Sequence, residues 1–349
     1  MAHFFNMAGA SLRTFFMTSF LDPAILFFAF GVMAGLFKSN LEVPQQISRF
    51  LSLYLLMALG LKGGFALAKS GLTLEVAVSL ACAVALAIAI PALSFFVLRR
   101  VVSGFDAAAV AATYGSVSAV TFITAVQYLE THAIPFGGHM AAAMALMESP
   151  AIVLAIVTAN MLRQRAAGSA VVAYSSGNAA LAVPKNLSMG RVLHESFTDG
   201  AQLLLLGSML VGILSGETGK AAMQPFSGDL FKGMLAFFLL DMGLLTARNL
   251  GQLKGKAPAL LAYAIFAPLV HAGLALALAA LVGMSVGNAT LLTVLAASAS
   301  YIAVPAVLRH ALPEANASLY FGMSLGLTFP FNILIGIPLY AAAAHWLLA

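Results

Sequence analysis

Charged residues are scarce in this sequence of 349 residues: 17 Lys or Arg and 12 Asp or Glu make up only 8% of it. A soluble domain carries about 25% charged residues, so this chain has too few charges to cover a water-exposed globule. Its 62% hydrophobic content excludes a disordered chain, which would contain too little apolar surface to fold. The net charge of +5 is too dilute for nucleic acid binding, which needs clustered Lys and Arg. We therefore predict a polytopic membrane protein with most of its length in the lipid bilayer.

Cysteine is almost absent as well, and Cys82 alone cannot form an intrachain disulfide. The first twenty residues contain one basic residue, Arg13, and no cleavable signal is expected among them. Instead, the first membrane span is expected to direct insertion. Asp22 and Pro23 predict the start of that span, because Asp is a favoured N-cap and Pro a favoured first helical residue.

Ten stretches of the chain are apolar and approach or exceed the roughly 20 residues that a helix needs to cross a bilayer. The predicted fold class is therefore an all-α membrane protein with ten transmembrane helices. The predicted spans are 22–37, 46–69, 73–98, 106–130, 137–162, 197–215, 227–248, 257–284, 288–311 and 316–347. Residues 163–196 are more polar and are expected to form a linker between a first five-helix repeat, 20–162, and a second, 197–347.

The Lys and Arg residues of the loops predict the orientation of the protein, because they concentrate on the cytoplasmic side of a membrane. If the N-terminus is outside, twelve of the 17 basic residues face the cytoplasm. The five on the outside are Arg13, Lys62, Lys69, Lys220 and Lys232. This asymmetry predicts that both termini face outside and that the linker is cytoplasmic.

The two five-helix blocks resemble each other along their length. The landmark pairs are Asp22 with Asp199, Gly35 with Gly212, Gly60 with Gly243, Ser116 with Ser298, and Pro150 with Pro330, at separations of 177 to 183 residues. Because five is an odd number of spans, the second copy must enter the membrane upside down. The sequence therefore predicts an inverted repeat, which is typical of secondary transporters with a site near the midplane.

Small hydroxyl residues beside Gly or Pro occur at matched positions of the fourth and ninth predicted spans. They are Gly115, Ser116, Ser118 and Thr121 in the fourth span, and Ser298, Ser300 and Pro305 in the ninth. Such clusters predict broken helices, because Gly or Pro frees backbone groups that Ser and Thr then satisfy; the alternative is that they only permit close packing. The second halves would begin near Ala119 and Ile302 and point their N-termini at one small cavity. Two helix N-termini form an anion site without a Lys or Arg residue.

One carboxylate, Glu148, is predicted at mid-depth, and its counterpart in the second repeat is Thr328. A carboxylate in the apolar core is costly and is therefore a functional candidate. With Thr328 and Asn332 it is assigned to a Na⁺ site, while a structural hydrogen bond is the alternative for Glu148. His271 in the eighth span is interpreted as a packed neutral histidine, with a proton relay as the alternative.

Taken in order, these motifs resemble the sodium-dependent bicarbonate transporters first known from cyanobacteria. The resemblance extends from about Phe20 to Tyr340, and its motifs are Gly115-Ser116-Val117-Ser118, Met147-Glu148-Ser149-Pro150-Ala151, Ala296-Ala297-Ser298-Ala299-Ser300 and Leu308-Arg309-His310-Ala311-Leu312-Pro313-Glu314-Ala315-Asn316. It implies Na⁺-coupled bicarbonate symport across a bacterial inner membrane by alternating access, a homotrimer, and a PII-like regulatory protein on the cytoplasmic side. It implies no enzymatic activity.

The resemblance also implies which residues form the two sites. Bicarbonate would be bound by Gly115, Ser116, Ser118, Thr121, Ser298, Ser300 and Tyr301, and Na⁺ by Glu148, Thr328 and Asn332. Tyr301 stands where the cyanobacterial pattern has Asp, so this chain has one carboxylate fewer. That difference concerns the sodium site and the choice of anion. The short, lightly charged linker bears on the regulator.

Two alternatives stand beside this interpretation. One is a Na⁺-coupled symporter of the same fold for another small anion, such as a carboxylate or sulfate. The remote one is an intramembrane serine hydrolase that pairs Ser116 or Ser118 with His271.

Overall fold

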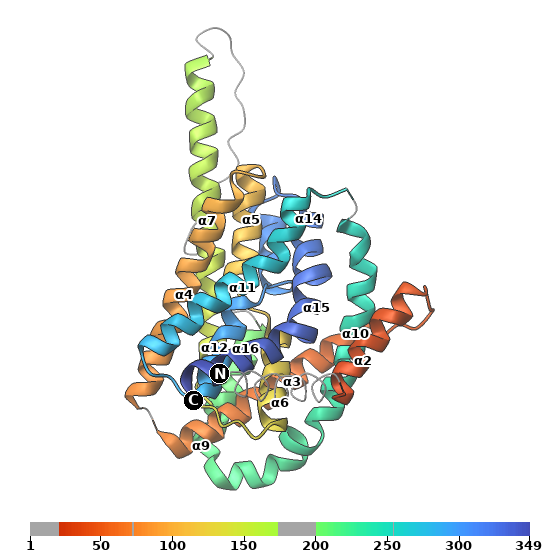
Figure 1. Ribbon diagram of the computed structural model, residues 1–349, viewed down its shortest axis with the longest axis vertical. Coiled ribbons are helices and arrows are strands. Elements are labelled where there is room, and N and C mark those ends of the chain that lie inside the picture. The colour runs from red at the N-terminus through yellow and green to blue at the C-terminus, as the bar shows by residue number, and fades with distance from the viewer. Residues whose placement is uncertain (1–20, 72, 174–199, 254) are drawn as a thin grey trace, which may run out of the picture.

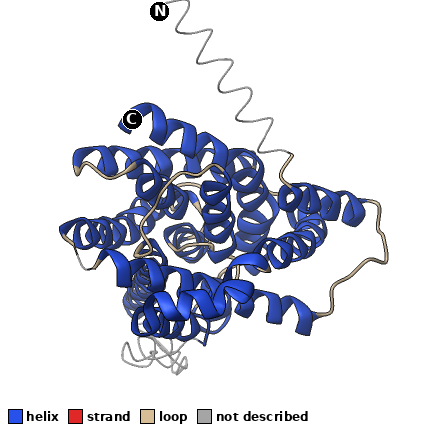
Figure 2. Ribbon diagram, turned by 90° about the horizontal axis from the view of Figure 1, so that it is seen from below, coloured by secondary structure: helices blue, strands red, loops and turns tan. Residues whose placement is uncertain are grey.

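The computed structural model describes residues 21–71, 73–173, 200–253 and 255–349, and its regular structure is helical throughout these segments (Figures 1 and 2). The helices before the gap at 174–199 are α2 (Pro23–Leu36), α3 (Gln45–Ser70), α4 (Leu74–Leu98), α5 (Gly104–Gly115), α6 (Ala119–Thr131) and α7 (Met140–Ala173). Those after it are α9 (Gly200–Met223), η1 (Gln224–Asp229), α10 (Phe231–Leu250), η2 (Gly251–Leu253), α11 (Pro258–Leu281), α12 (Val286–Ala297), α13 (Ala303–Ala311), α14 (Ala317–Phe321), η3 (Gly322–Thr328), α15 (Phe329–Phe331), η4 (Asn332–Gly336) and α16 (Ile337–Leu348).

Several helical stretches of the described residues are long and apolar enough to cross a membrane. The seven are Gln45–Ser70, Leu74–Leu98, Gly104–Thr131, Met140–Gln164, Gly200–Leu250, Pro258–Leu281 and Ala317–Leu348. The helices α2 and α12 are apolar but shorter. The prediction of an all-α, multi-pass membrane protein is therefore confirmed.

The first described helix starts as its sequence predicts. The side-chain Oδ1 of Asp22 accepts a hydrogen bond from the Ala24 N–H at 2.9 Å, and Pro23 is the first helical residue. Asp22 is thus the N-cap, and Pro23 is in the position where its missing N–H costs nothing.

The longest helix, α7, continues to Ala173 and projects beyond the other helices (Figure 1). It runs through the first part of the predicted linker, 163–196, and the rest of that linker lies outside the described residues. Residues 1–20, which include the predicted outer N-terminus, also lie outside them.

The Leu-Pro-Glu-Ala-Asn motif connects α7 to two other helix ends. The guanidinium of Arg163 donates two hydrogen bonds of 2.8 Å to the Glu314 carboxylate and one of 2.9 Å to Ala311 O. These bonds hold the pKa of the Glu314 carboxyl below its usual range. Asn316 accepts from Ser318 N–H as the N-cap of α14, and its own N–H donates to Asp106 near the start of α5. The motif therefore connects the start of α5, the end of α13 and the start of α14 to Arg163 within α7.

Two pairs of helices pack along each other with close backbone contact, α2 on α10 and α3 on α9. A side chain at Gly243 of α10 would overlap the Phe28 carbonyl oxygen and lie 3.0 Å from Gly31 Cα of α2. A side chain at Gly60 of α3 would overlap the Leu205 carbonyl oxygen and lie 2.8 Å from the Cβ atom of Ser208 in α9. Both contacts need glycine because the backbones approach too closely for any Cβ.

These two contacts are related by the separations of the sequence repeat. Phe28 and Gly31 precede their counterparts Leu205 and Ser208 by 177 residues, and Gly60 precedes Gly243 by 183. In the α2–α10 pair a glycine of the second half contacts two residues of the first half. In the α3–α9 pair the matching glycine of the first half contacts the two matching residues of the second half.

The remaining helices form a second group beside these pairs. In it α4 packs on α5 and α7, and α11 packs on α12 and η3. Two of its short helices, α5 and α12, are buried over most of their length: every residue from Ala107 to Val117 and from Gly287 to Tyr301 is buried. This second group holds both of the non-helical segments described below.

We predict that Gly243→Ala destabilises the protein by about 1–3 kcal/mol, because the new methyl group forces α2 and α10 apart. The measurement is the thermal unfolding midpoint of the purified protein. Gly207→Ala in α9 is the control, since nothing lies within 4 Å of a Cβ there. An unchanged midpoint for Gly243→Ala would contradict the close contact.

Candidate functional site

A cavity of about 190 Å³, here called the central cavity, lies between α3, α6, α7, α9 and α13. Its walls include Ala119 and Ala303, which are the first residues of α6 and α13. Leu56 of α3 and Leu205 of α9 also line it. The two helix starts expected near Ala119 and Ile302 therefore line the same small space.

Hydroxyl groups cap both helix starts. The Oγ atom of Ser118 accepts hydrogen bonds from the Thr121 N–H at 3.2 Å and from its hydroxyl at 2.9 Å. The Oγ atom of Ser300 accepts from the Val304 N–H at 3.3 Å. A helix leaves up to four N–H groups at its start without an intrahelical acceptor, and each serine caps one. Pro305, the third residue of α13, has no N–H. The remaining N–H groups, with the positive ends of two helix dipoles, suit an anion in the central cavity.

Hydrogen bonds join the two non-helical segments, 116–118 and 298–302. One bond links the segments directly, and another links the second segment to α5. The Ser118 N–H donates to Ser298 Oγ at 3.0 Å, and Ser298 in turn donates to Leu295 O at 2.9 Å. The Ser300 N–H donates to Thr113 O at 2.8 Å. These bonds hold the two helix starts together.

The predicted anion residues fall into two sets. Ser118, Ser300 and Tyr301 line the central cavity. The others do not line it: Ser116 donates to Glu148 O at 3.4 Å, and the Thr121 hydroxyl donates to Ser118 Oγ at 2.9 Å. Ser298, likewise, is occupied in joining the two non-helical segments.

Gly115 is needed for packing. A side chain there would overlap the ring of Pro91 in α4. Tyr301 is 5% exposed, and its ring packs edge to face on Phe329 with centroids 5.1 Å apart. It therefore forms an aromatic part of the cavity wall where the related pattern has a carboxylate.

Glu148 of α7 lines the central cavity, and its carboxylate accepts a hydrogen bond of 2.7 Å from the Gln202 amide of α9. Gln202 also lines the cavity and was not among the predicted site residues. The signal that could have identified it is its position as a lone amide within an apolar stretch. This bond connects the two groups of helices across the cavity.

Thr328 and Asn332 do not line the central cavity. Thr328 Oγ1 donates to Ala264 O at 2.7 Å and lies 2.6 Å from the Tyr114 hydroxyl. Asn332 donates to Ala297 O at 2.8 Å and accepts from Tyr340 at 2.9 Å. Both side chains are buried. Asn332 binds the backbone at the end of α12, whereas Thr328 binds the backbone of α11 and the Tyr114 side chain of α5. Their assignment to a cation site stays a prediction.

His271 is buried, as the interpretation of a packed histidine expects. Its Nε2 atom lies 3.5 Å from Ser94 Oγ of α4. Ser118, the candidate nucleophile of the hydrolase alternative, instead caps α6 and lines a different part of the molecule. The serine that His271 contacts is therefore Ser94, and Ser116, the other candidate, donates to Glu148 O.

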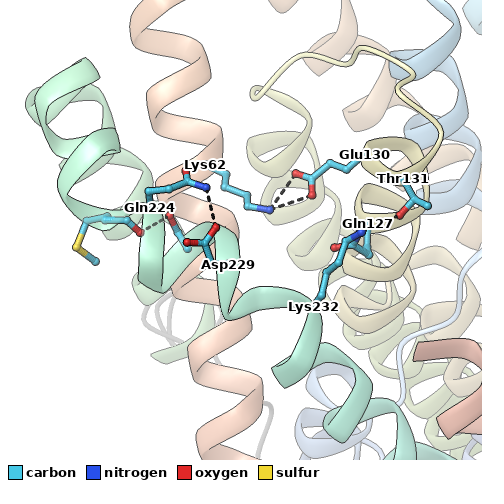
Figure 3. Close-up of polar contacts among 9 residues, drawn as sticks. Lys62, Gln127, Glu130, Thr131, Gln224, Asp229 and Lys232 are labelled. Carbon is cyan, nitrogen blue, oxygen red and sulfur yellow. Dashed lines mark hydrogen bonds and ion pairs between the residues drawn. The ribbon is translucent and has the colours of Figure 1, made fainter. Parts of the chain in front are cut away.

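A second and larger cavity, of about 630 Å³, lies along the same helices and is here called the lysine cavity (Figure 3). Leu59 of α3 and Met140 of α7 line it, whereas Leu56 and Met144 line the central cavity. These positions are three and four residues apart, about one helical turn. The two cavities are therefore about one helical turn apart along the interface, and these residues between them are apolar. Phe122 of α6, which is also apolar, lines the lysine cavity.

A comparison with protein families identifies the family of this chain. The chain matches the Na⁺-dependent bicarbonate transporter superfamily over residues 23–345. The chain belongs to this superfamily. Comparison with curated proteins finds no match. Membership confirms the resemblance drawn from the sequence motifs and makes the protein a member of a transporter family.

We predict that Ala119→Leu or Ala303→Leu abolishes bicarbonate binding, because the larger side chain fills the central cavity at a helix start. Ser118→Ala or Ser300→Ala should weaken binding by about 1–2 kcal/mol, the value of one hydrogen bond in a preformed site. The measurement is a bicarbonate titration of the purified variants.

Ala89→Leu is the matched control for the two leucine variants, since Ala89 is an exposed residue of α4. It should bind like the parent protein. Unchanged affinity in both Ala119→Leu and Ala303→Leu would place the anion elsewhere.

Proposed function

We propose that the protein is a secondary active transporter that couples bicarbonate uptake to Na⁺ and works by alternating access around the central cavity. The observation that carries this proposal is that two helix starts and one carboxylate line the same small cavity. The helix starts favour an anion, and Glu148 favours a cation. A cavity that favours both ions at once fits a symporter better than a channel or an enzyme.

A small monoanion suits the central cavity better than a phosphate. Among the described residues that line it there is no Lys or Arg, so two half charges from helix N-termini provide the positive potential. We assign direct contacts with bicarbonate to Ser118, Ser300 and Tyr301. Ser116, Ser298, Thr121 and Gly115 are assigned the supporting role of holding the helix starts. A carboxylate or sulfate symporter is the alternative.

Glu148 is the residue to which we assign Na⁺ coupling. A bound cation would neutralise its carboxylate and would attract an anion at the neighbouring helix starts. For unit charges about 5–6 Å apart, this attraction is worth about 3 kcal/mol at an effective dielectric constant of about 20. Each ion should then tighten the binding of the other by the same factor. Thr328 and Asn332 are proposed to complete this site in another conformation of the chain.

The proposed architecture is two inverted five-helix repeats, 20–162 and 197–347, with a cytoplasmic linker at 163–196. The exchanged glycine contacts of the α2–α10 and α3–α9 pairs support it, because an inverted repeat generates each contact twice. The proposed broken spans are α5–α6 and α12–α13, the fourth and ninth of ten. The basic residues support an orientation with both termini outside a bacterial inner membrane.

Alternating access is supported by the two cavities on one interface. The helices α3 and α9 form one side of both, and α6 and α7 form the other. A shift of the second side along the first by about one helical turn would transfer the helix starts from one cavity towards the other. The family also implies a homotrimer and a PII-like cytoplasmic regulator, which we carry over as part of the proposal.

Uptake into proteoliposomes tests the proposal directly. Labelled bicarbonate should accumulate under an inward Na⁺ gradient and should not accumulate under a matched K⁺ gradient. Accumulation of a carboxylate or sulfate in place of bicarbonate would support the alternative substrate. Equal accumulation with K⁺ would contradict the coupling.

We predict that Glu148→Gln folds normally but removes the effect of Na⁺ on bicarbonate affinity, because the neutral amide no longer attracts a cation. The measurement is a bicarbonate titration with and without Na⁺. Glu42→Gln is the control, since Glu42 is an exposed loop residue. If Na⁺ still tightens binding in Glu148→Gln, the buried carboxylate of Asp241 becomes the next candidate for coupling.

A further inference from the structure

The lysine cavity gathers basic residues that are far apart in the sequence. The four that line it are Lys62, Lys69, Lys220 and Lys232. They are all the described members of the set that the loop charges place outside the membrane. Three carboxylates, those of Glu130, Glu217 and Asp229, line the cavity as well, so its lining carries one net positive charge. The cavity lies on the same helix interface as the central cavity, about one helical turn away.

Two of these lysines are already paired with carboxylates. Lys62 Nζ lies 2.9 Å from Glu130 and also 4.1 Å from the centroid of the Phe231 ring (Figure 3). Lys220 lies 3.9 Å from Glu217, one turn away on the same helix. Their charges are thus largely balanced within the protein.

Lys232, at the start of α10, differs from these two. Its Nζ atom lies 3.5 Å from the hydroxyl oxygen of Thr131, and in the described part of the chain no carboxylate lies within 4.0 Å of it. The same hydroxyl oxygen accepts a hydrogen bond of 3.0 Å from the Gln127 amide nitrogen. Lys232 and Gln127 are therefore held side by side by one hydroxyl group, as Figure 3 shows.

Gln127 carries the second, independent observation. Its side chain is 4% exposed and lines the lysine cavity. Its carbonyl oxygen, Oε1, is buried and has no hydrogen-bond partner among the described residues. A buried acceptor without a donor is costly, so this oxygen calls for a ligand that can donate a hydrogen bond.

We infer that Lys232, Gln127 and Thr131 form an outer site for a small monoanion that carries one hydroxyl group. The ammonium of Lys232 would bind the charged oxygens. A small rotation of the Gln127 side chain, which lines the cavity, would bring its buried Oε1 within reach of the ligand's hydroxyl group. Bicarbonate has this combination of groups, whereas formate and nitrate have the charge without the hydroxyl. The site rests on the proposed function and adds to it a place where the anion is selected before it reaches the central cavity.

Transport kinetics provide the first test. With external bicarbonate well below its KM, Lys232→Gln should lower the rate of uptake about three- to tenfold, and the deficit should shrink as the concentration rises. Lys220→Gln, which removes one charge from the same cavity, should change the rate less than twofold. Equal effects of the two variants would show a general effect of charge and would overturn the site.

A binding experiment separates the outer site from the proposed function. In the Ala303→Leu protein, where the central cavity is filled, ¹³C-labelled bicarbonate should still show protein-dependent line broadening. In that background, Lys232→Gln should remove the broadening. Gln127→Leu should remove the preference for bicarbonate over formate, so that bicarbonate and ¹³C-formate are broadened equally.

The outcomes of the two experiments are distinguishable. If the parent protein shows no Na⁺-driven bicarbonate uptake but the broadening depends on Lys232, the proposed function fails and the outer site stands. If broadening in the Ala303→Leu protein is absent, or is the same with Lys232→Gln, the outer site is wrong whatever the parent transports.

Discussion

The central constraint of this structure is that two helices begin inside the protein, at Ala119 and Ala303, and face one cavity. In an apolar environment every backbone N–H must find a partner within the protein or in a ligand. Ser118 and Ser300 each satisfy one of these groups. The Ser118 N–H donates to Ser298 and the Ser300 N–H donates to the Thr113 carbonyl, so one bond from each non-helical segment holds the pair in register. The rest of the site follows from holding these two ends fixed.

The surrounding helices form two groups with different roles. Close glycine contacts make α2–α10 and α3–α9 rigid pairs against which the other helices lie. Charge is distributed unevenly between the cavities that these groups enclose. Four lysines and three carboxylates line the larger one, whereas no Lys or Arg among the described residues lines the smaller one, where the two helix starts lie. In the proposed transport cycle, a monoanion would meet full charges first and weaker partial charges afterwards, and the weaker charges would permit its release.

Much of this arrangement could be predicted from the sequence, because it depends on residue types at fixed local positions. Asp22 and Pro23 mark a helix start, and clusters of small hydroxyl residues lie where α5 and α12 end. Glu148, the lone carboxylate of its span, does line the central cavity. In each of these cases the local chemistry of caps and of charge in an apolar core is sufficient.

What the sequence could not provide depends on contacts between distant segments. Gln202 reaches the cavity only because α9 packs on α3, and nothing in its own stretch indicates this partner. Thr328 was paired with Glu148 by repeat position, yet its hydroxyl bonds to Ala264 and Tyr114. Apolar helices of similar composition do not specify which face of each helix lines a cavity.

The most direct test of this account is a structure of the protein determined with bicarbonate and Na⁺ at a resolution that shows bound anions. The account predicts an anion in the central cavity whose oxygens lie within hydrogen-bond distance, about 2.7–3.2 Å, of backbone N–H groups at the starts of both α6 and α13. An anion bound away from both helix starts, with those N–H groups satisfied by protein atoms, would contradict it.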